Sequence, residues 1–321
     1  MDNITTHKNL TVIKERLFDE LQSVIVGQNQ ILEEIFICLL CKGHILLEGV
    51  PGLGKTLIIK TLSEACDLKF SRIQFTPDLM PSDIIGTEMI QEDTSSKERT
   101  LKFIKGPIFG NIVLADEINR TPPKTQAALL EAMQEYSVTI GGQSYKLDEP
   151  FLVLATQNPI EQEGTYPIPE AQLDRFMFNI IIDYPNISDE VKIVNQATSN
   201  INNKISKIID GLSLLEFQKL VRNVPVSDNV VNYAVDLVNR TRPASADKKT
   251  ADLILWGAGP RASIYLVIAA KAKALLDGRT TPDINDIKSV SKQVLRHRIV
   301  INFNAEADGI TKDEIIDMLI A

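Results

Sequence analysis

The chain has 321 residues, of which 44% are hydrophobic and 24% are charged, an ordinary balance for a soluble globular protein with one large or two moderate domains. Its formal net charge of −8 gives no electrostatic reason to hold nucleic acid non-specifically. The polar N-terminus lacks the apolar core of a secretion signal and no apolar run is long enough to insert into a bilayer, so we expect a cytoplasmic protein without membrane insertion.

Two helices are predicted before the first strand. Apolar residues recur with helical spacing from Leu10 to Leu21, and a second apolar helix is predicted over residues 30–41. The C-x-x-C of Cys38 and Cys41 lies in this second helix. Because the chain holds one further cysteine and three histidines, we interpret the pair as core residues rather than as a zinc or redox site.

Residues 49–56, Gly-Val-Pro-Gly-Leu-Gly-Lys-Thr, match the phosphate-binding pattern G-x-x-x-x-G-K-[ST]. They follow a predicted strand at 44–47 and open a helical stretch, which is the context that the motif requires. Glycines let successive N–H groups point at phosphate oxygens, and the positive end of the helix adds to the same spot. Lys55 is expected to reach the β- and γ-phosphates, and the Thr56 hydroxyl to bind Mg²⁺. The nucleotide-binding residues predicted here are Gly49, Pro51, Gly52, Leu53, Gly54, Lys55, Thr56 and Leu57.

Upstream of this loop, Val26 and Gly27 begin a Val-Gly-Gln sequence. On its own such a sequence is more typical of a helix boundary than of a binding site. Beside a phosphate loop it is expected to form a wall against the adenine.

An insertion is predicted after a strand at 70–75. Pro77 and Pro81 are expected to break regular structure. Residues 83–110 then resemble a β-hairpin with a charged, solvated tip. A working contact surface and a merely exposed loop are equally compatible with this pattern.

A continuous apolar run at 112–115 ends in Asp116 and Glu117. This pattern favours a strand buried in a parallel sheet, with its carboxyl end at the ligand crevice. Asp116 lies where a phosphate loop needs a carboxylate for the Mg²⁺ shell, and Glu117 is placed to polarise an attacking water. Paired acids of this kind otherwise mark a strand end that meets solvent. The upstream loop favours the catalytic interpretation.

The next elements are a helix at 124–135, a hairpin at 137–151 that turns at two glycines, and a second buried strand at 151–156. That strand is followed by Asn158, whose amide could fix the water or the γ-phosphate. Elsewhere an Asn-Pro pair would be only a turn signal.

A division of the chain is predicted near residues 185–186, after a last strand at 178–182. Ser188 is expected to cap the helix that follows. Helical periodicity then continues to the C-terminus, with helices at 230–238, at 261–277 and after Asp283. The pattern predicts a small all-helical second domain.

The loop, Asp116-Glu117, Asn158 and Arg175 stand in the order of an AAA+ ATPase, which the chain resembles. More narrowly, it resembles the MoxR family at residues 116–126, 155–166, 173–176, 257–262 and 294–298, and the similarity extends over nearly all of the chain after about Val24. The resemblance implies an α/β fold. Residues 1–185 would form a P-loop, parallel-sheet AAA+ ATPase domain with β-hairpin insertions, and residues 186–321 a helical lid domain.

The resemblance also implies residue roles. Glu117 is then the catalytic carboxylate, Asn158 the first sensor and Arg261 the second sensor at the start of a lid helix. Arg175 is then the arginine finger, which completes the site of a neighbouring subunit. An ion pair with Asp174 or with Glu170 is the alternative for Arg175.

ATP and Mg²⁺ are the implied cofactors, and a ring, usually a hexamer, is the implied assembly. Client proteins are the implied partners, including proteins with a von Willebrand type A domain. The two hairpins would face the pore or the substrate. Gly259 departs from the family, where serine is more frequent, and is expected to loosen the turn before Arg261. Arg120 and Arg240 could also approach phosphates.

Three functions follow in order of preference. The first is an ATP-hydrolysing, chaperone-like ATPase that remodels, assembles or activates partner proteins. The second is a nucleic-acid-stimulated motor, which the acidic balance disfavours. The third is a module that binds ATP only as a structural ligand.

Overall fold

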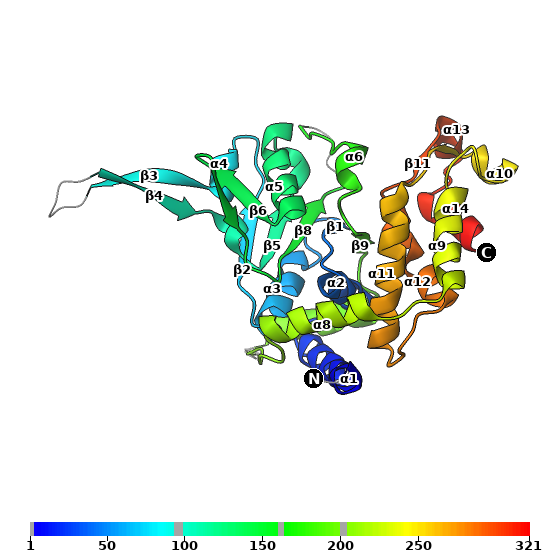
Figure 1. Cartoon of the computed structure of the whole chain (residues 1–321), viewed down its shortest axis with the longest axis horizontal. Coiled ribbons are helices and arrows are strands. Elements are labelled where there is room, and N and C mark those ends of the chain that lie inside the picture. Colours follow the sequence, from blue (N-terminus) through cyan, green and yellow to red (C-terminus); the bar gives the residue numbers. More distant parts are fainter. Residues whose placement is uncertain (1–2, 93–98, 160–163, 200–203) are drawn as a thin grey trace.

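The computed structural model describes residues 3–92, 99–159, 164–199 and 204–321. Across these residues, no helix combines the length and the apolar character that crossing a membrane requires. The chain divides visibly into a sheet-containing part and a helical part that lie side by side (Figure 1).

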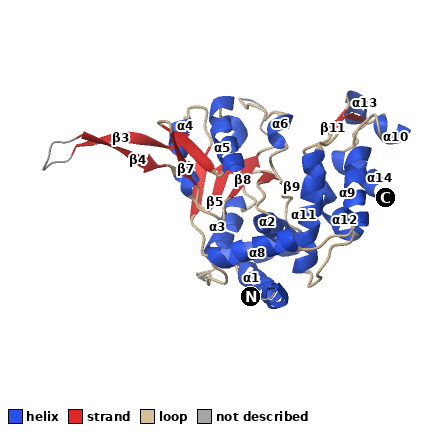
Figure 2. Ribbon diagram, in the orientation of Figure 1, coloured by secondary structure: helices blue, strands red, loops and turns tan. Residues whose placement is uncertain are grey.

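Five parallel strands form the central sheet in the order β2-β5-β8-β1-β9; Figure 1 labels them, and Figure 2 draws strands in red. They are β1 (Ile45–Glu48), β2 (Phe70–Gln74), β5 (Ile112–Asp116), β8 (Leu152–Gln157) and β9 (Phe178–Ile181). β5 and β8 are apolar until their carboxyl ends, where Asp116, Thr156 and Gln157 stand, and both of their faces pack against apolar clusters. The predicted parallel-sheet α/β fold is thereby confirmed.

Alternate residues of β5 belong to different cores. Ile112 and Leu114 join the cluster formed with α2 (Asn29–Leu40) and α3 (Lys55–Ala65). Val113 and Ala115 join the cluster on the opposite face, with α5 (Pro123–Glu135). Two other helices, α1 (Asn3–Gln22) and α8 (Gly211–Asn223), extend the first cluster beyond α2.

Both predicted hairpins are present. The first pairs β3 (Gly86–Glu92) with β4 (Arg99–Lys105) and projects from the body in Figure 1; the tip predicted between them, residues 93–98, lies outside the described residues. The second pairs β6 (Ser137–Ile140) with β7 (Gln143–Lys146). The ring centroids of Phe103 and Tyr145 are 4.3 Å apart, so the two hairpins pack against each other.

Pro81 does not interrupt regular structure as predicted. It is the first residue of a short helix, α4 (Pro81–Ile85). The missing N–H of proline costs nothing at this position, because the first helical N–H groups have no partner within the helix. The Asp83 carboxylate accepts a hydrogen bond from the Met80 N–H at 2.9 Å and completes the cap.

The helical part begins at α7 (Ile187–Thr198), and its N-cap is Asn186 rather than the predicted Ser188. The Asn186 side chain accepts a hydrogen bond from the Asp189 N–H at 3.0 Å. A two-stranded antiparallel ladder, which the helical periodicity did not predict, joins residues far apart in this part. The remaining elements are α6 (Glu170–Leu173), α9 (Asp228–Arg240), α10 (Lys248–Ala251), β10 (Ile254–Trp256), α11 (Pro260–Leu276), α12 (Ile284–Leu295), β11 (Val300–Ile301), α13 (Phe303–Ala307) and α14 (Lys312–Ile320).

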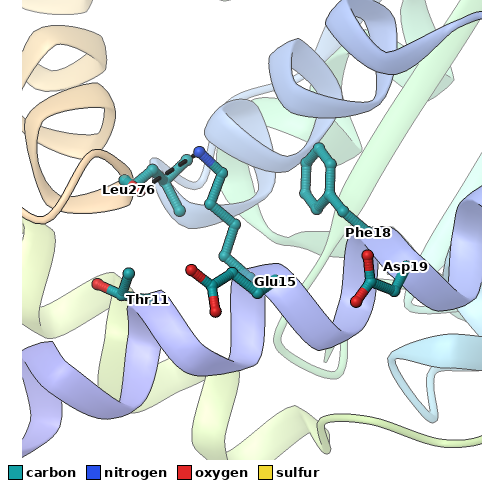
Figure 3. Close-up of a pocket in the computed structure, with 6 residues that line it drawn as sticks. Thr11, Glu15, Phe18, Asp19 and Leu276 are labelled. Carbon is teal, nitrogen blue, oxygen red and sulfur yellow. Dashed lines mark hydrogen bonds between the residues drawn. The ribbon is translucent and has the colours of Figure 1, made fainter.

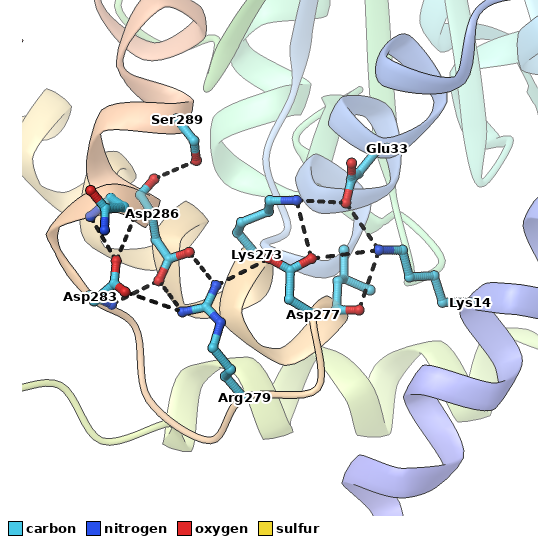
Figure 4. Close-up of polar contacts among 10 residues, drawn as sticks. Lys14, Glu33, Lys273, Asp277, Arg279, Asp283, Asp286 and Ser289 are labelled. Carbon is cyan, nitrogen blue, oxygen red and sulfur yellow. Dashed lines mark hydrogen bonds and ion pairs between the residues drawn. The ribbon is translucent and has the colours of Figure 1, made fainter.

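Charged side chains join α1 and α2 to the C-terminal helices. Glu33 of α2 accepts hydrogen bonds from Lys14 at 3.1 Å and from Lys273 at 3.0 Å, as Figure 4 shows. Arg279 binds the buried carboxylate of Asp286 nearby. Because α8 and α11 pack against α1 and α2, and α12 packs against β9, the segment after residue 185 contacts the sheet-containing part through three of its helices. The division at 185–186 stays a prediction.

Candidate nucleotide site

The glycine-rich loop connects β1 to α3 at the carboxyl edge of the sheet. Gly52 and Gly54 have φ angles of 88° and 73°, which glycine adopts without strain, and a Cβ on either would meet no atom within 4 Å. Their backbone therefore borders open space. Gly54 is the N-cap of α3, so the first N–H groups of an eleven-residue helix open toward the same space.

A cavity of about 440 Å³ lies above this loop. It unites nine of the predicted residues with three that were not predicted. The predicted ones are Pro51, Gly52, Leu53, Gly54, Lys55, Thr56, Asp116, Glu117 and Asn158. The additional ones are Arg72, Gln74 and Thr156.

The two acids are held by neighbouring strands. The Thr156 hydroxyl of β8 donates to Asp116 Oδ1 at 2.7 Å and accepts from the Glu117 N–H at 2.8 Å. From β2, Arg72 Nη2 donates to Asp116 Oδ2 at 2.6 Å. Both oxygens of Asp116 thus have partners within the chain.

Glu117 adopts the left-handed conformation, with φ 59° and ψ 49°, which is uncommon for a residue other than glycine. Its Oε2 accepts a hydrogen bond from Gln74 Nε2 at 2.9 Å and lies 3.1 Å from Arg120 Nε. The turn aims the carboxylate into the cavity, where a general base would have to lie. Arg120, whose role the sequence left open, therefore contacts the catalytic candidate itself.

Lys55 is the loop residue whose charge interacts with both acids. Its ammonium group donates to the carbonyl oxygen of Gly49. Burial lowers the pKa of Lys55, while Asp116 and Glu117 act on it in the opposite direction. A phosphate bound over the loop would give this cation a stronger acceptor than a neutral carbonyl.

The donor set at Thr56 and Asp116 fits a hard cation, because both residues offer oxygen atoms to the same cavity. Over the described residues, no group of three or more His, Cys, Asp or Glu side chains could hold a metal without other ligands. A Mg²⁺ ion there would take its remaining ligands from phosphates and water, which is how such ions are usually bound beside nucleotides.

Gly27 lines a second cavity, of about 490 Å³, that also includes Gln293 from the helical part. A Cβ on Gly27 would lie 2.5 Å from Asp189 Oδ2, and the φ angle of 76° also favours glycine. The side-chain oxygens of Gln28 and Gln293 are buried without a hydrogen-bond partner, and both residues line this cavity. Gln28 connects the two cavities, because its Nε2 donates to the carbonyl of Leu53 at 3.5 Å.

Two predicted arginines lie away from both cavities. Arg175 donates to the Leu130 carbonyl at 2.9 Å and lines a separate hollow of about 250 Å³. The alternative ion pair of Arg175 with Asp174 or Glu170 is not formed. Arg261 donates to Asp174 Oδ2 at 2.8 Å and is not among the residues that line the phosphate cavity.

Three other predicted residues also lie outside the linings. Val26 and Leu57 line neither cavity, nor does Gly49, the first residue of the loop, whose Cβ position would lie 2.8 Å from the Ile182 carbonyl oxygen. Arg240 pairs with Asp236 of its own helix at 3.0 Å.

A hollow of about 460 Å³ along α1 has a different character (Figure 3). Its lining includes Glu15, Asp19 and Leu276, and no part of the glycine-rich loop. It marks where α1 meets the end of α11.

The sequence held only part of the signal that places Arg72 and Gln74 at the site. β2 pairs with β5 so that Gln74 lies opposite Asp116 and Arg72 lies opposite Leu114. Side chains at opposed positions of paired strands share a face, and alternate residues of one strand do too. The Arg-Ile-Gln alternation was visible in the sequence, but the neighbour of its strand was not.

Two family models match the chain. The model for the ATPase family associated with various cellular activities (AAA) matches residues 44–178, and the AAA lid domain matches residues 247–319. Chaperone MoxR1 of Mycobacterium tuberculosis is 42% identical over 95% of this chain and 80% of its own length. Protein YeaC of Bacillus subtilis is 42% identical over 93% and 90%, and protein MoxR of Paracoccus denitrificans is 30% identical over 88% and 87%. A crystal structure of a Cytophaga hutchinsonii protein assigned as an ATPase superposes with a TM-score of 0.90 and 43% identity, over 98% of this chain and 96% of that one.

Proposed function

Because this chain belongs to the MoxR family of AAA+ ATPases, we propose that it hydrolyses ATP to ADP and phosphate in order to remodel, assemble or activate partner proteins. One observation carries the proposal: Lys55, Thr56, Asp116, Glu117 and Asn158 line a single cavity over the glycine-rich loop. A carboxylate base, a lysine and oxygen ligands around one phosphate cradle are the set that phosphoryl transfer to water requires.

Each residue has a distinct task. The loop N–H groups and Lys55 would bind the phosphates, and Thr56 with Asp116 would hold Mg²⁺, which would neutralise charge on the phosphates. Glu117 accepts a proton from the attacking water, while the Asn158 amide orients that water or the terminal phosphate. Gln74 and Arg120 hold the Glu117 carboxylate at the cavity wall until then.

The base of the nucleotide is proposed to lie in the cavity beside Gly27. The unpartnered oxygens of Gln28 and Gln293 support this placement, because buried acceptors are costly unless a ligand supplies donors. The exocyclic amine of adenine is such a donor. One wall of this cavity comes from the helical part, so a bound nucleotide would contact both parts of the chain.

Arg175 is proposed to act on the site of a neighbouring subunit. Its position outside the phosphate cavity of its own chain supports this role, because an arginine that stabilises the transferred phosphate must reach it. A homo-oligomeric ring, with a hexamer as the expected size, would bring it there. We propose that Arg261 becomes the second sensor when it exchanges Asp174 for the nucleotide.

The client is proposed to be a protein, in line with the chaperone name of the mycobacterial relative. A partner with a von Willebrand type A domain is our specific expectation. Met89, Ile90 and Ile104 are exposed on the projecting hairpin and offer apolar contacts to such a client. No observation in the structure favours the nucleic-acid motor.

A mixing experiment tests the proposal. Glu117→Gln and Arg175→Ala should each bind ATP but reduce hydrolysis by about 10²-fold or more. When the two variants are mixed, part of the activity should return, because an intact Glu117 then meets an intact Arg175 across an interface. The matched control is Arg16→Ala, which removes an exposed arginine from α1 and should leave hydrolysis unchanged.

The contrary outcomes are specific. Absence of recovery on mixing, with normal ATP binding, would place Arg175 in its own site. Normal hydrolysis by Glu117→Gln would show that Glu117 is not the general base, whereas ATP binding without hydrolysis by the wild-type protein would make ATP a structural ligand.

A further inference from the structure

Arg72 is a cation of the phosphate cavity that none of the roles above uses. It projects from β2 and contacts Asp116 Oδ2 with two nitrogens, Nη2 at 2.6 Å and Nε at 3.2 Å. Its Nη2 also donates to Gln74 Oε1 at 2.8 Å, which fixes the plane of the guanidinium. The side chain is 48% exposed, so it can leave this position without opening the core.

The carboxylate that Arg72 contacts is the one assigned to Mg²⁺. Thr156 engages Oδ1 of Asp116, so Arg72 takes the remaining oxygen. A guanidinium at this distance has the same sign of charge as Mg²⁺ and claims the same lone pairs. The ion and Arg72 therefore cannot both make their best contact with Asp116.

A plain surface ion pair is the simpler interpretation of this contact. Two features argue for more. Both nitrogens converge on one oxygen of a residue that lines the cavity, and Arg72 itself lines that cavity beside Lys55. An arginine that only stabilised the edge strand could equally well pair with an exposed carboxylate away from the site.

We propose that Arg72 is a positioning residue that occupies Asp116 in the nucleotide-free chain and competes with Mg²⁺ for it. The inference rests on the proposed nucleotide site. In the empty site, Arg72 balances the charge of Asp116 and keeps its carboxylate oriented. When the metal arrives with the nucleotide, Arg72 has to yield, so this residue sets the Mg²⁺ concentration at which the site becomes loaded.

The test uses full-length protein and a fluorescent ADP analogue, with binding measured by titration at a series of Mg²⁺ concentrations. Arg72→Gln should lower the half-saturating Mg²⁺ concentration by about two- to fivefold, the range expected for removing a partly exposed ion pair. Arg72→Lys keeps the charge but cannot contact Asp116 with two nitrogens. Its half-saturating Mg²⁺ concentration should therefore lie between those of the wild type and Arg72→Gln. The control is Lys60→Gln, which removes an equal charge from the exposed face of α3 and should match the wild type.

A half-saturating Mg²⁺ concentration that is unchanged or higher in Arg72→Gln, with nucleotide binding retained, overturns the role of Arg72 alone. Failure of the wild-type protein to bind the analogue at any Mg²⁺ concentration would reject the nucleotide site, and the role of Arg72 with it. If Arg72→Gln does not fold, Arg72→Lys decides. A shift in the expected direction supports competition, and the wild-type value contradicts it.

Discussion

Asp116 and Asp174 each accept hydrogen bonds from arginine, but the two pairs differ in their surroundings. Arg72 reaches Asp116 across an open cavity and remains half exposed. Arg298 reaches Asp174 Oδ1 at 2.7 Å with a side chain that is 1% exposed. Asp174 also binds Arg261, so it joins the sheet-containing part to α11 and to the end of α12.

The two contacts differ in whether solvent can reach the arginine. Burial lowers the pKa of Arg298 and Asp174 opposes that shift, so Asp174 compensates for the burial of this charge. Removing one member of a buried pair leaves a charge without solvent or counter-ion, whereas an exposed pair can be replaced by water. Asp174 therefore stabilises the contact between the two parts, and Asp116 remains available to a ligand.

The largest effect is expected from Asp174→Asn. It should lower the free energy of unfolding by roughly 3–5 kcal/mol, because Arg298 stays buried without a negative partner. Urea denaturation at neutral pH measures the loss, and Asp19→Asn on exposed α1 is the matched control. A loss below about 1 kcal/mol would show that the buried pair resembles a surface pair.

The second largest effect is expected from acid, which should lower the free energy of unfolding through the buried His44. Burial lowers the pKa of His44 from 6.5 to about 4. Its Nδ1 accepts a hydrogen bond from the Val153 N–H, so protonation of Nδ1 would break that bond. The unfolded chain binds that proton more readily, so stability is complete above about pH 6.5 and falls as the pH drops toward 4, by about 3 kcal/mol from this residue.

Urea denaturation at several pH values between 7 and 4.5 tests the effect of His44. His44→Gln should make the dependence on pH shallower, by up to one proton per molecule. His297, whose pKa burial also lowers, remains as a second contribution. An unchanged slope in the variant would assign the acid sensitivity to other groups.

Arg72→Gln should cost less than about 1 kcal/mol of stability, because the lost ion pair is half exposed and Thr156 still holds Asp116. The same denaturation experiment gives the value. A loss as large as that of Asp174→Asn would erase the distinction between the two pairs and make Arg72 a structural residue.

The smallest effect is expected at the start of α11. Gly259 is the N-cap of this helix, with an extended backbone at φ −83°, and a Cβ there would meet nothing within 4 Å. Gly259→Ser should raise the free energy of unfolding by a few tenths of a kcal/mol through a side-chain cap before Arg261. A lower melting temperature of Gly259→Ser would show that a serine at this position does not stabilise α11.

The sequence was sufficient for the features that depend on local pattern. The loop at Lys55, the buried run before Asp116 and both hairpins follow from glycine placement and hydrophobic periodicity, which are local properties. The prediction that Pro81 breaks regular structure was wrong, because proline is as well suited to the first position of a helix as it is to ending one. The role of Arg175 stays a prediction.

Contacts between distant segments could not be predicted. Asp174 was considered as a partner of its neighbour Arg175, whereas its actual partners lie on the helical part, at Arg261 and Arg298. Arg72 became visible only when β2 was placed beside β5. Such pairings depend on strand order and helix packing, and periodicity within one segment carries no information on either.

The root of the first hairpin has a mechanical consequence. A Cβ on Gly86 would lie 2.2 Å from the Ile104 carbonyl, and one on Gly106 would lie 2.3 Å from the Ile84 carbonyl, so the backbones are in direct contact there. Seven residues of β3 extend from this root, a lever arm of about 20 Å. A rotation of about 10° at the root would displace the far end by roughly 3.5 Å, taking that arm length from the rise of an extended strand. The length of the hairpin thus turns a small rotation at its root into a displacement of several ångströms at its far end.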